Sequence, residues 1–403
     1  MTTVPRIPLK RHVRDAGARL VLDAVAAATA RKSGTSPRRR IGVFLFWGIG
    51  DAVLAIPFLH ALRMAYPEAR IDAIGKPWLE ALFGDERLFD GYQTLVPPWT
   101  KHRGKYRLWS EEWRDFARSV RSLGRTEYDL LIGLRPDPRE TALARLLATA
   151  EYAGYAAEGG RAWVSIDIGV DRSRHPFERS AKLEPGLYRG TLAARAAAAL
   201  LGTNVPGLPL LAVRPPPDEL VRRLREAGYR GGPILALAFG AAQATRRWSG
   251  ERIGASLRGL KMRPGAILLI ESEGSPSIAL GRDTPTVAWN GSLSELKRVL
   301  TLADVLFCTD SGPMHIGAAV GCRVVALFGP GSLERFAPPP PHAVYAVEPM
   351  PCRPCSDYCI YSSPLCMDRL EPSAAAVLLD QALAGVGRPR AESMLPMPEV
   401  LQA

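Results

Sequence analysis

The sequence predicts an α/β protein with two doubly wound parallel sheets that face each other across a cleft. Short apolar runs of strand length alternate with helical stretches, as expected for repeated βα units. This alternation stops at the proline-rich residues 206–217 and then starts again. We therefore expect a first domain at residues 41–213 and a second at 214–385. A basic extension at 1–40 and a tail at 386–403 flank them.

The apolar runs predict the strands of both sheets. Each run is short and bounded by polar or turn residues, which is typical of buried parallel strands. The expected strands lie at residues 41–47, 70–74, 92–96, 128–134, 234–239, 266–270, near Val287, at 305–308 and at 323–328. The expected helices lie at residues 52–66, 77–83, 110–123, 138–148, 250–262, 276–281 and 292–302.

Composition places the chain among globular proteins. It has 403 residues, of which 47% are hydrophobic and 23% charged, and these values are ordinary for a soluble fold. No apolar run reaches the roughly 18 residues that a membrane span needs. The first residues also lack the apolar core of a signal peptide. We therefore expect a cytoplasmic protein.

The positive charge is concentrated at the N-terminus. The net charge is +12, and residues 1–40 hold ten Lys or Arg against two Asp. Residues 13–30 can form a basic amphipathic helix that lies on the inner face of an anionic membrane, or a helix that packs on the protein. No nucleic-acid recognition motif accompanies this charge, so we expect no nucleic-acid partner.

Residues 305–315 predict a strand, a polar turn and a helix. Asp310 and Ser311 suit the N-cap, and Pro313 suits the first helical turn. The free N–H groups and positive dipole end of such a helix suit a phosphate, and His315 lies in the same turn. An ordinary capped junction explains the same residues.

A second polar turn follows the first expected strand. Gly48 and Gly50 lie in this turn, and Asp51 begins the next helix. Val53 replaces the third glycine of a dinucleotide fingerprint, so that motif is incomplete. Asp51 is either a helix N-cap or a carboxylate held at the strand end where open α/β sheets keep their active sites. Both interpretations can hold together.

Six cysteines are present, and four of them form a cluster. Cys308 and Cys322 are expected to be buried thiols. In a cytoplasmic chain the cluster favours a metal or redox site over disulfides. Structural zinc is one interpretation, and reduced thiols packed in an irregular loop are the other. The clustered residues are Cys352, Cys355, Cys359 and Cys366.

Four motifs together resemble glycosyltransferase family 9, the lipopolysaccharide heptosyltransferases. The resemblance covers roughly residues 41–385. The motifs are GDAVLAIP at residues 50–57, FG at 239–240 followed by RRW at 246–248, DSGPMH at 310–315 with LFGP at 327–330, and the cysteine cluster with its following Met367.

The resemblance implies the GT-B fold and a particular reaction. An inverting enzyme would transfer a heptose, or a related sugar, from an ADP-sugar to a lipopolysaccharide-core or lipid-linked acceptor. No metal is needed for the chemistry in this family. Asp51 matches the proposed general base, which deprotonates the attacking hydroxyl. The first domain would bind the acceptor and the second the donor.

The donor site is expected in the second domain. Positive charge and N–H donors there would stabilise the leaving diphosphate. Arg246 stands where the family usually has Lys, which keeps the charge but changes the geometry. Glu271 and Glu273 both occupy the stretch where the family carries a donor-binding Glu. The donor-binding candidates are Gly240, Arg246, Glu273, Asp310, Ser311, Gly312, Met314 and His315.

The acceptor side carries basic candidates. Lys101 and Arg103 lie in a basic, aromatic loop, and Arg135 ends another expected strand. These cations suit an anionic acceptor. Two other functions stay open: a nucleotide-sugar epimerase or hydrolase on the same fold, and a non-catalytic nucleotide-sugar-binding protein. Neither would transfer a sugar to an acceptor.

Overall fold

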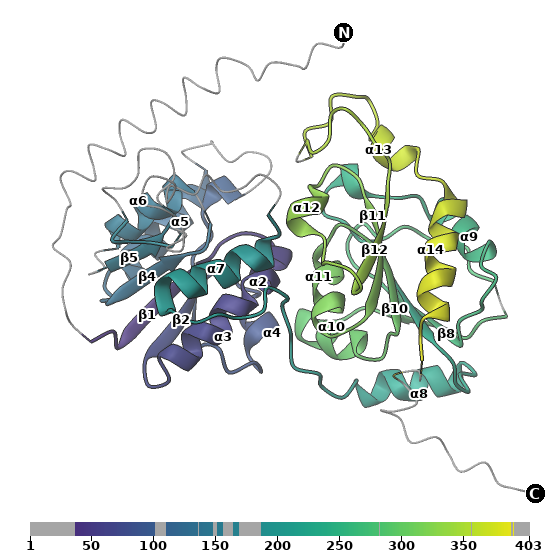
Figure 1. Ribbon diagram of the computed structural model, residues 1–403, viewed down its shortest axis with the longest axis horizontal. Helices are drawn as coiled ribbons and strands as arrows, with labels where there is room; N and C mark the ends of the chain where they lie inside the picture. The colour runs from purple at the N-terminus through teal and green to yellow at the C-terminus, as the bar shows by residue number, and fades with distance from the viewer. Residues whose placement is uncertain are drawn as a thin grey trace, which may run out of the picture.

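The computed structural model shows two α/β lobes side by side (Figure 1), each built on a parallel six-stranded sheet. This confirms the predicted fold class. The structure describes residues 37–100, 110–135, 137–147, 151–155, 164–168, 187–281, 283–355, 357–387 and 390. Within these residues, no helix is both long and apolar enough to cross a membrane.

The first sheet has the strand order β3-β2-β1-β4-β5-β6. Its central strand β1 is apolar and almost wholly buried, as expected for a parallel strand covered on both faces. The last two strands were not expected from the sequence. The strands are β1 (Arg40–Leu45), β2 (Arg70–Gly75), β3 (Gly91–Thr94), β4 (Leu130–Gly133), β5 (Glu151–Gly154) and β6 (Ile166–Asp167).

The helix expected at 52–66 is divided in two. It begins earlier, at Ile49, and breaks at Ala55 between α2 and α3. Pro57 explains the break because it has no N–H to donate to the carbonyl of Val53. The helices of this lobe are α2 (Ile49–Leu54), α3 (Ile56–Ala65), α4 (Leu79–Phe83), η1 (Pro98–Thr100), α5 (Glu111–Leu123), α6 (Pro138–Leu146) and α7 (Arg189–Leu201).

The second sheet has the strand order β12-β11-β10-β7-β8-β9. Its central strands are fully buried, and β8 and β11 have the bounds that the sequence predicts. The outer strand β12 was not expected. The strands are β7 (Ile234–Ala238), β8 (Ala266–Ile270), β9 (Thr286–Trp289), β10 (Val305–Thr309), β11 (Arg323–Phe328) and β12 (Ala343–Val347).

One expected helix, at residues 276–281, is wrong. This segment has no regular structure, and its backbone lies along α9. A Cβ on Gly250 would lie 1.7 Å from the carbonyl oxygen of Ser277. Packing against α9, which half-buries Ile278 and Leu280, replaces the helix. The helices of this lobe are α8 (Asp218–Glu226), η3 (Ala244–Arg246), α9 (Gly250–Arg258), α10 (Leu293–Leu300), α11 (Gly312–Ala319), α12 (Leu333–Phe336), α13 (Leu365–Asp368) and α14 (Pro372–Ala384).

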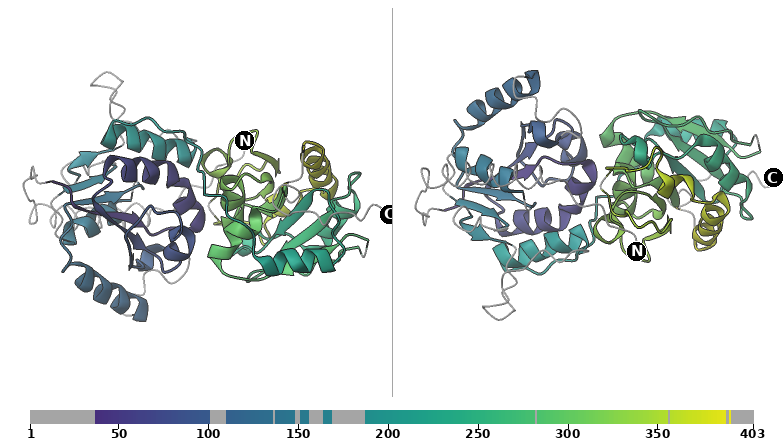
Figure 2. Two further views of the ribbon diagram at one scale, coloured as in Figure 1. Left: turned by 90° about the horizontal axis from the view of Figure 1, so that it is seen from below. Right: turned by 90° about the horizontal axis from the view of Figure 1, so that it is seen from above.

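The lobes meet through two helix pairs, α2 with α11 and α4 with α10, and Figure 2 shows the junction from two opposite sides. At the second pair, Lys297 of α10 is buried. It pairs with Asp85 and with Glu86, whose Oε1 lies 3.1 Å from the Lys297 Nζ. These contacts set how the carboxyl edges of the two sheets face each other.

Candidate active site

Polar side chains from both sheets converge at the carboxyl ends of their strands. This is the edge where open α/β sheets bind ligands. Asp51 follows β1 and Arg135 follows β4 in the first lobe, while Asp310 follows β10 in the second. Because α2 packs on α11, these loops lie across one interface. Burial raises the pKa of Asp310, Arg246 lowers it, and Asp357 and Asp51 raise it further. Asp51 on the first-lobe wall of the interface therefore acts on Asp310 on the second-lobe wall.

Asp51 lies in the first turn of α2 and has two partners. Its Oδ1 accepts from Arg135 Nη1 at 2.9 Å, and its Oδ2 accepts from the N–H of Gly48 at 3.2 Å. The sequence suggested Asp51 as the helix N-cap, but α2 begins earlier: Gly48 is the N-cap, and Asp51 is the third helical residue, whose side chain accepts from the N-cap N–H as in a capping box. About 29% of the Asp51 side chain stays exposed. The carboxylate is therefore both a cap and an accessible group.

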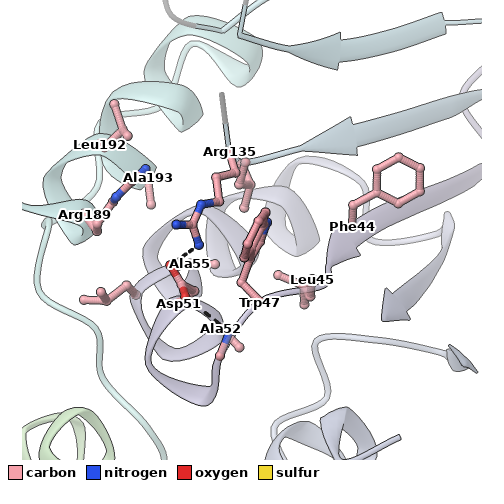
Figure 3. A pocket seen from close by; sticks show the side chains of 13 residues that line it. Phe44, Leu45, Trp47, Asp51, Ala52, Ala55, Arg135, Arg189, Leu192 and Ala193 are labelled. Atoms are coloured by element: carbon pink, nitrogen blue, oxygen red, sulfur yellow. Dashed lines mark hydrogen bonds and ion pairs between the residues drawn. The ribbon is translucent and has the colours of Figure 1, made fainter. Parts of the chain in front are cut away.

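Arg135 is held by an aromatic ring as well as by Asp51 (Figure 3). Its guanidinium carbon lies 4.0 Å from the centre of the Trp47 ring. Trp47 Nε1 in turn donates to Oε1 of Glu140 at 2.5 Å. Burial raises the pKa of Glu140 to about 8. A buried carboxylic acid therefore stands behind the ring that supports Arg135.

Two further cations lie near Asp51. Asp51, Arg135 and Trp47 line a cavity that is also lined by Arg189, from the start of α7. Lys76 follows β2. Burial lowers the pKa of both groups, while Asp51 raises both. The cavity has a volume of about 50 Å³, which is room for a few water-sized groups beside Asp51.

In the second lobe, Arg246 lies between two carboxylates. Its Nε and Nη2 contact Oδ1 and Oδ2 of Asp357 at 2.9 and 2.7 Å. Its Nη1 donates to the backbone oxygen of Asp310 at 3.0 Å and lies 3.2 Å from Asp310 Oδ2. Only about 5% of each carboxylate side chain is exposed. The guanidinium is thus largely occupied by the protein's own acids.

The DSGPMH turn and the GDAVLAIP segment touch across the interface. A Cβ on Gly50 would lie 2.5 Å from Cδ2 and 2.6 Å from Nε2 of His315. Glycine therefore permits the close approach of α2 and α11. Burial lowers the pKa of His315 to about 4, so the ring is neutral at neutral pH. His315 packs the two walls together without adding positive charge for a phosphate.

The remaining donor candidates differ in exposure. Ser311 is the N-cap of α11, but its hydroxyl donates to the carbonyl of Thr309 at 3.2 Å. The Met314 side chain is wholly buried, so only its backbone can face a ligand. Glu273 is exposed on the loop after β8. A Cβ on Gly240 would lie 1.8 Å from Ser272 Oγ, which brings the loops after β7 and β8 together.

The four clustered cysteines are free thiols, as are Cys308 and Cys322, which are buried as expected. Among the described residues, no group of three or more His, Cys, Asp or Glu side chains could hold a metal ion. As placed, the thiols do not fit a zinc site, and the structural zinc stays a prediction. The loop instead contributes Asp357, which accepts from Thr245 Oγ1 at 2.8 Å besides pairing with Arg246.

Some candidates lie beyond the described residues, and other residues were missed. Lys101, Arg103 and the predicted N-terminal helix lie outside the described residues. Lys76 could have been found because it lies just beyond Gly75 at the end of an expected strand. The sequence gives no local signal for the contacts of the other missed residues, Trp47, Glu140, Arg189 and Asp357.

Comparisons with known proteins point to one family. The model of glycosyltransferase family 9 (heptosyltransferase) matches residues 116–362. The chain belongs to this family. Lipopolysaccharide heptosyltransferase 3 of Escherichia coli is 24% identical over 302 residues, covering 70% of this chain and 80% of that protein. Lipopolysaccharide heptosyltransferase 1 of Pseudomonas aeruginosa is 24% identical over 366 residues, covering 83% and 95%.

Solved structures show the same fold. The Escherichia coli ADP-heptose lipopolysaccharide heptosyltransferase II matches with a TM-score of 0.60 at 16% identity, covering 86% of this chain and 98% of that one. A family 9 glycosyltransferase from Veillonella parvula matches with a TM-score of 0.58 at 18% identity, covering 88% and 100%. The chain described here therefore has the GT-B fold that its own sequence predicts.

Proposed function

We propose that this transferase moves a heptose, or a related sugar, from an ADP-sugar to a lipopolysaccharide-core acceptor with inversion. The named relatives support this proposal, since both curated ones are lipopolysaccharide heptosyltransferases. One similar structure, an Escherichia coli heptosyltransferase (TM-score 0.58), contains ADP-2-deoxy-2-fluoro heptose. The observation that carries the proposal is the accessible Asp51 carboxylate, which lies across the interface from the turn that begins α11.

Asp51 is the proposed general base. Its two oxygens each accept one contact in the protein, which leaves lone pairs for an acceptor hydroxyl. The hydroxyl oxygen bonds to the anomeric carbon as its proton passes to Asp51. The bond from that carbon to the diphosphate breaks on the opposite face, and ADP leaves with the electron pair.

The donor diphosphate is assigned to the turn at 310–315 and to Arg246. The N–H of Gly312, the first of α11, has no acceptor within the helix, and the helix dipole favours negative charge there. Pro313 has no N–H, and the N–H of Met314 donates to the carbonyl of Ser311 at 3.2 Å. Arg246 lies beside the same turn. Because Asp357 holds its Nε and Nη2, the donor has to share or displace that carboxylate.

The acceptor is assigned to the first lobe. Arg189 lines the cavity beside Asp51, and Lys76 lies within electrostatic reach of the same carboxylate. Cations so placed favour an acceptor that carries an acidic group near the attacking hydroxyl. Lys101 and Arg103 remain proposed contributors from the neighbouring loop.

A donor panel tests the proposed function. ADP-heptose, UDP-sugars, GDP-sugars and other ADP-sugars are each incubated with the enzyme, with and without a lipopolysaccharide-core acceptor. We expect ADP release and sugar transfer with ADP-heptose only when the acceptor is present. Equal ADP release without acceptor would favour a hydrolase, and conversion of the sugar itself an epimerase. Tight donor binding with no turnover on any core acceptor would favour a non-catalytic binding protein.

A further inference from the structure

A buried carboxyl group, that of Glu140, contacts the Trp47 ring that supports Arg135 and, through it, Asp51. Glu140 lies on α6 and is only 1% exposed, and Trp47 follows β1. The Trp47 indole N–H donates to Oε1 of Glu140, 2.5 Å away. Trp47 is partly buried, and this hydrogen bond ties its N–H edge to a carboxyl group in the core. Glu140 therefore fixes which way the edge of the ring points.

The orientation of the ring decides what its face can support. With its N–H directed to Glu140, Trp47 presents a face to Arg135, whose guanidinium carbon lies 4.0 Å from the ring centre. A stacked guanidinium keeps its edge N–H groups free for a carboxylate. One of these N–H groups reaches Asp51 at 2.9 Å. The contacts form a continuous chain from the core to the proposed base.

We infer that Glu140 is a positioning residue for sugar transfer, acting through Trp47 and Arg135 on the orientation of the Asp51 carboxylate. This inference rests on the proposed role of Asp51. Glu140 touches neither donor nor acceptor in this scheme. Its contribution is to keep Asp51 aligned with the attacking hydroxyl, since small errors in such alignment have large effects on rate.

The surroundings of Glu140 keep it uncharged at neutral pH. Burial and Asp137 raise the pKa of Glu140, while the Trp47 hydrogen bond, Arg135 and Arg139 lower it, with a result of about 8. Tyr152 of β5 is buried beside it. A neutral carboxyl still accepts from Trp47 through its carbonyl oxygen. Glutamine, which keeps a carbonyl and carries no charge, is therefore the conservative substitute.

Steady-state kinetics at neutral pH give the first test. We expect Glu140→Leu to lower kcat roughly 30-fold, with the donor KM within about twofold. Glu140→Gln should restore most of that loss because its amide oxygen accepts the indole N–H. Leu143→Ala, a buried change on the same helix, is the matched control and should lower Tm while leaving kcat unchanged. Equal kcat in Glu140→Leu and Glu140→Gln would overturn the inference.

A measurement without substrate separates this inference from the proposed function. In protein labelled with ¹⁵N-tryptophan, the Trp47 Nε1–H signal is assigned by its loss in Trp47→Phe. We expect slow solvent exchange of this proton in the wild type and Glu140→Gln, and at least tenfold faster exchange in Glu140→Leu. Unchanged exchange in Glu140→Leu would overturn the inference. If the wild type transfers no sugar from any donor, the proposed function fails, whatever the exchange result.

Discussion

The two walls of the interface between the lobes hold their charges in opposite ways. On the first wall, one carboxylate, Asp51, faces one guanidinium, Arg135, and both side chains stay more than a quarter exposed. On the second wall, one guanidinium, Arg246, lies between Asp310 and Asp357, whose carboxylates are almost wholly buried. The first wall presents a base with free lone pairs. The second presents a cation that is already neutralised.

The two walls therefore differ in how easily their ion pairs can open to bind a substrate. A partly exposed ion pair exchanges partners at little cost, because water screens it and replaces lost contacts. A guanidinium with buried carboxylates can change partners only if another anion compensates, since an unpaired buried charge is costly. The proposed base is therefore ready as it stands. The proposed donor site needs the diphosphate to complete a rearrangement.

Removal of the base should have the largest effect. Asp51→Asn keeps the size and the backbone contact of the side chain but accepts a proton far less readily. We expect kcat to fall on the order of 10³-fold, as for other general bases. Donor affinity, measured by calorimetry with ADP-heptose, should stay within about twofold because the donor binds on the other wall.

A matched carboxylate serves as the control. Asp90→Asn removes a carboxylate of the same lobe that pairs with Arg63 and accepts from the N–H of Ile71 at the start of β2, at the sheet edge opposite Asp51. This variant should turn over at the wild-type rate. If Asp51→Asn retains more than about a tenth of the wild-type kcat, Asp51 is not the base and the contrast between the walls loses its meaning.

The contact between the walls gives the second prediction. Gly50→Ala would place a methyl group 2.5 Å from the His315 ring, so α2 and α11 have to separate. We expect kcat to fall roughly 30-fold, although every polar group of both walls is kept. Kinetics with saturating donor and acceptor measure this loss.

Two companion variants make that prediction specific. Gly281→Ala adds a methyl group where, apart from its chain neighbours, no described residue lies within 4 Å, and its rate should match the wild type. In Gly50→Ala/His315→Ala, the lost ring makes room for the methyl group, so kcat should rise above that of Gly50→Ala. If the double variant is slower than both single variants, His315 has a role beyond packing the walls together.

The sequence predicted where the site residues of both walls lie better than it predicted which side chains contact them. Asp51 and Asp310 could be found because each follows an apolar strand and opens a helix, and these signals are local. The partner of Arg246 could not be found in this way, since Asp357 is 111 positions away in the chain. It lies in a loop without regular structure, with φ 70°. The side chain that supports Trp47 comes from α6, and only packing of the sheet brings the two together.

Asp357→Asn tests the neutralised wall and has the smallest expected effect. An amide keeps the shape of the side chain but forms weaker hydrogen bonds with Arg246 than the carboxylate does. The diphosphate can therefore displace it from the guanidinium more easily. We expect the Kd for ADP-heptose to fall about threefold to tenfold and Tm to fall as well. Calorimetry measures the first and thermal unfolding the second. Weaker donor binding would mean that Asp357 orients Arg246 for the donor instead of competing with it. The two walls would then both be ready as they stand.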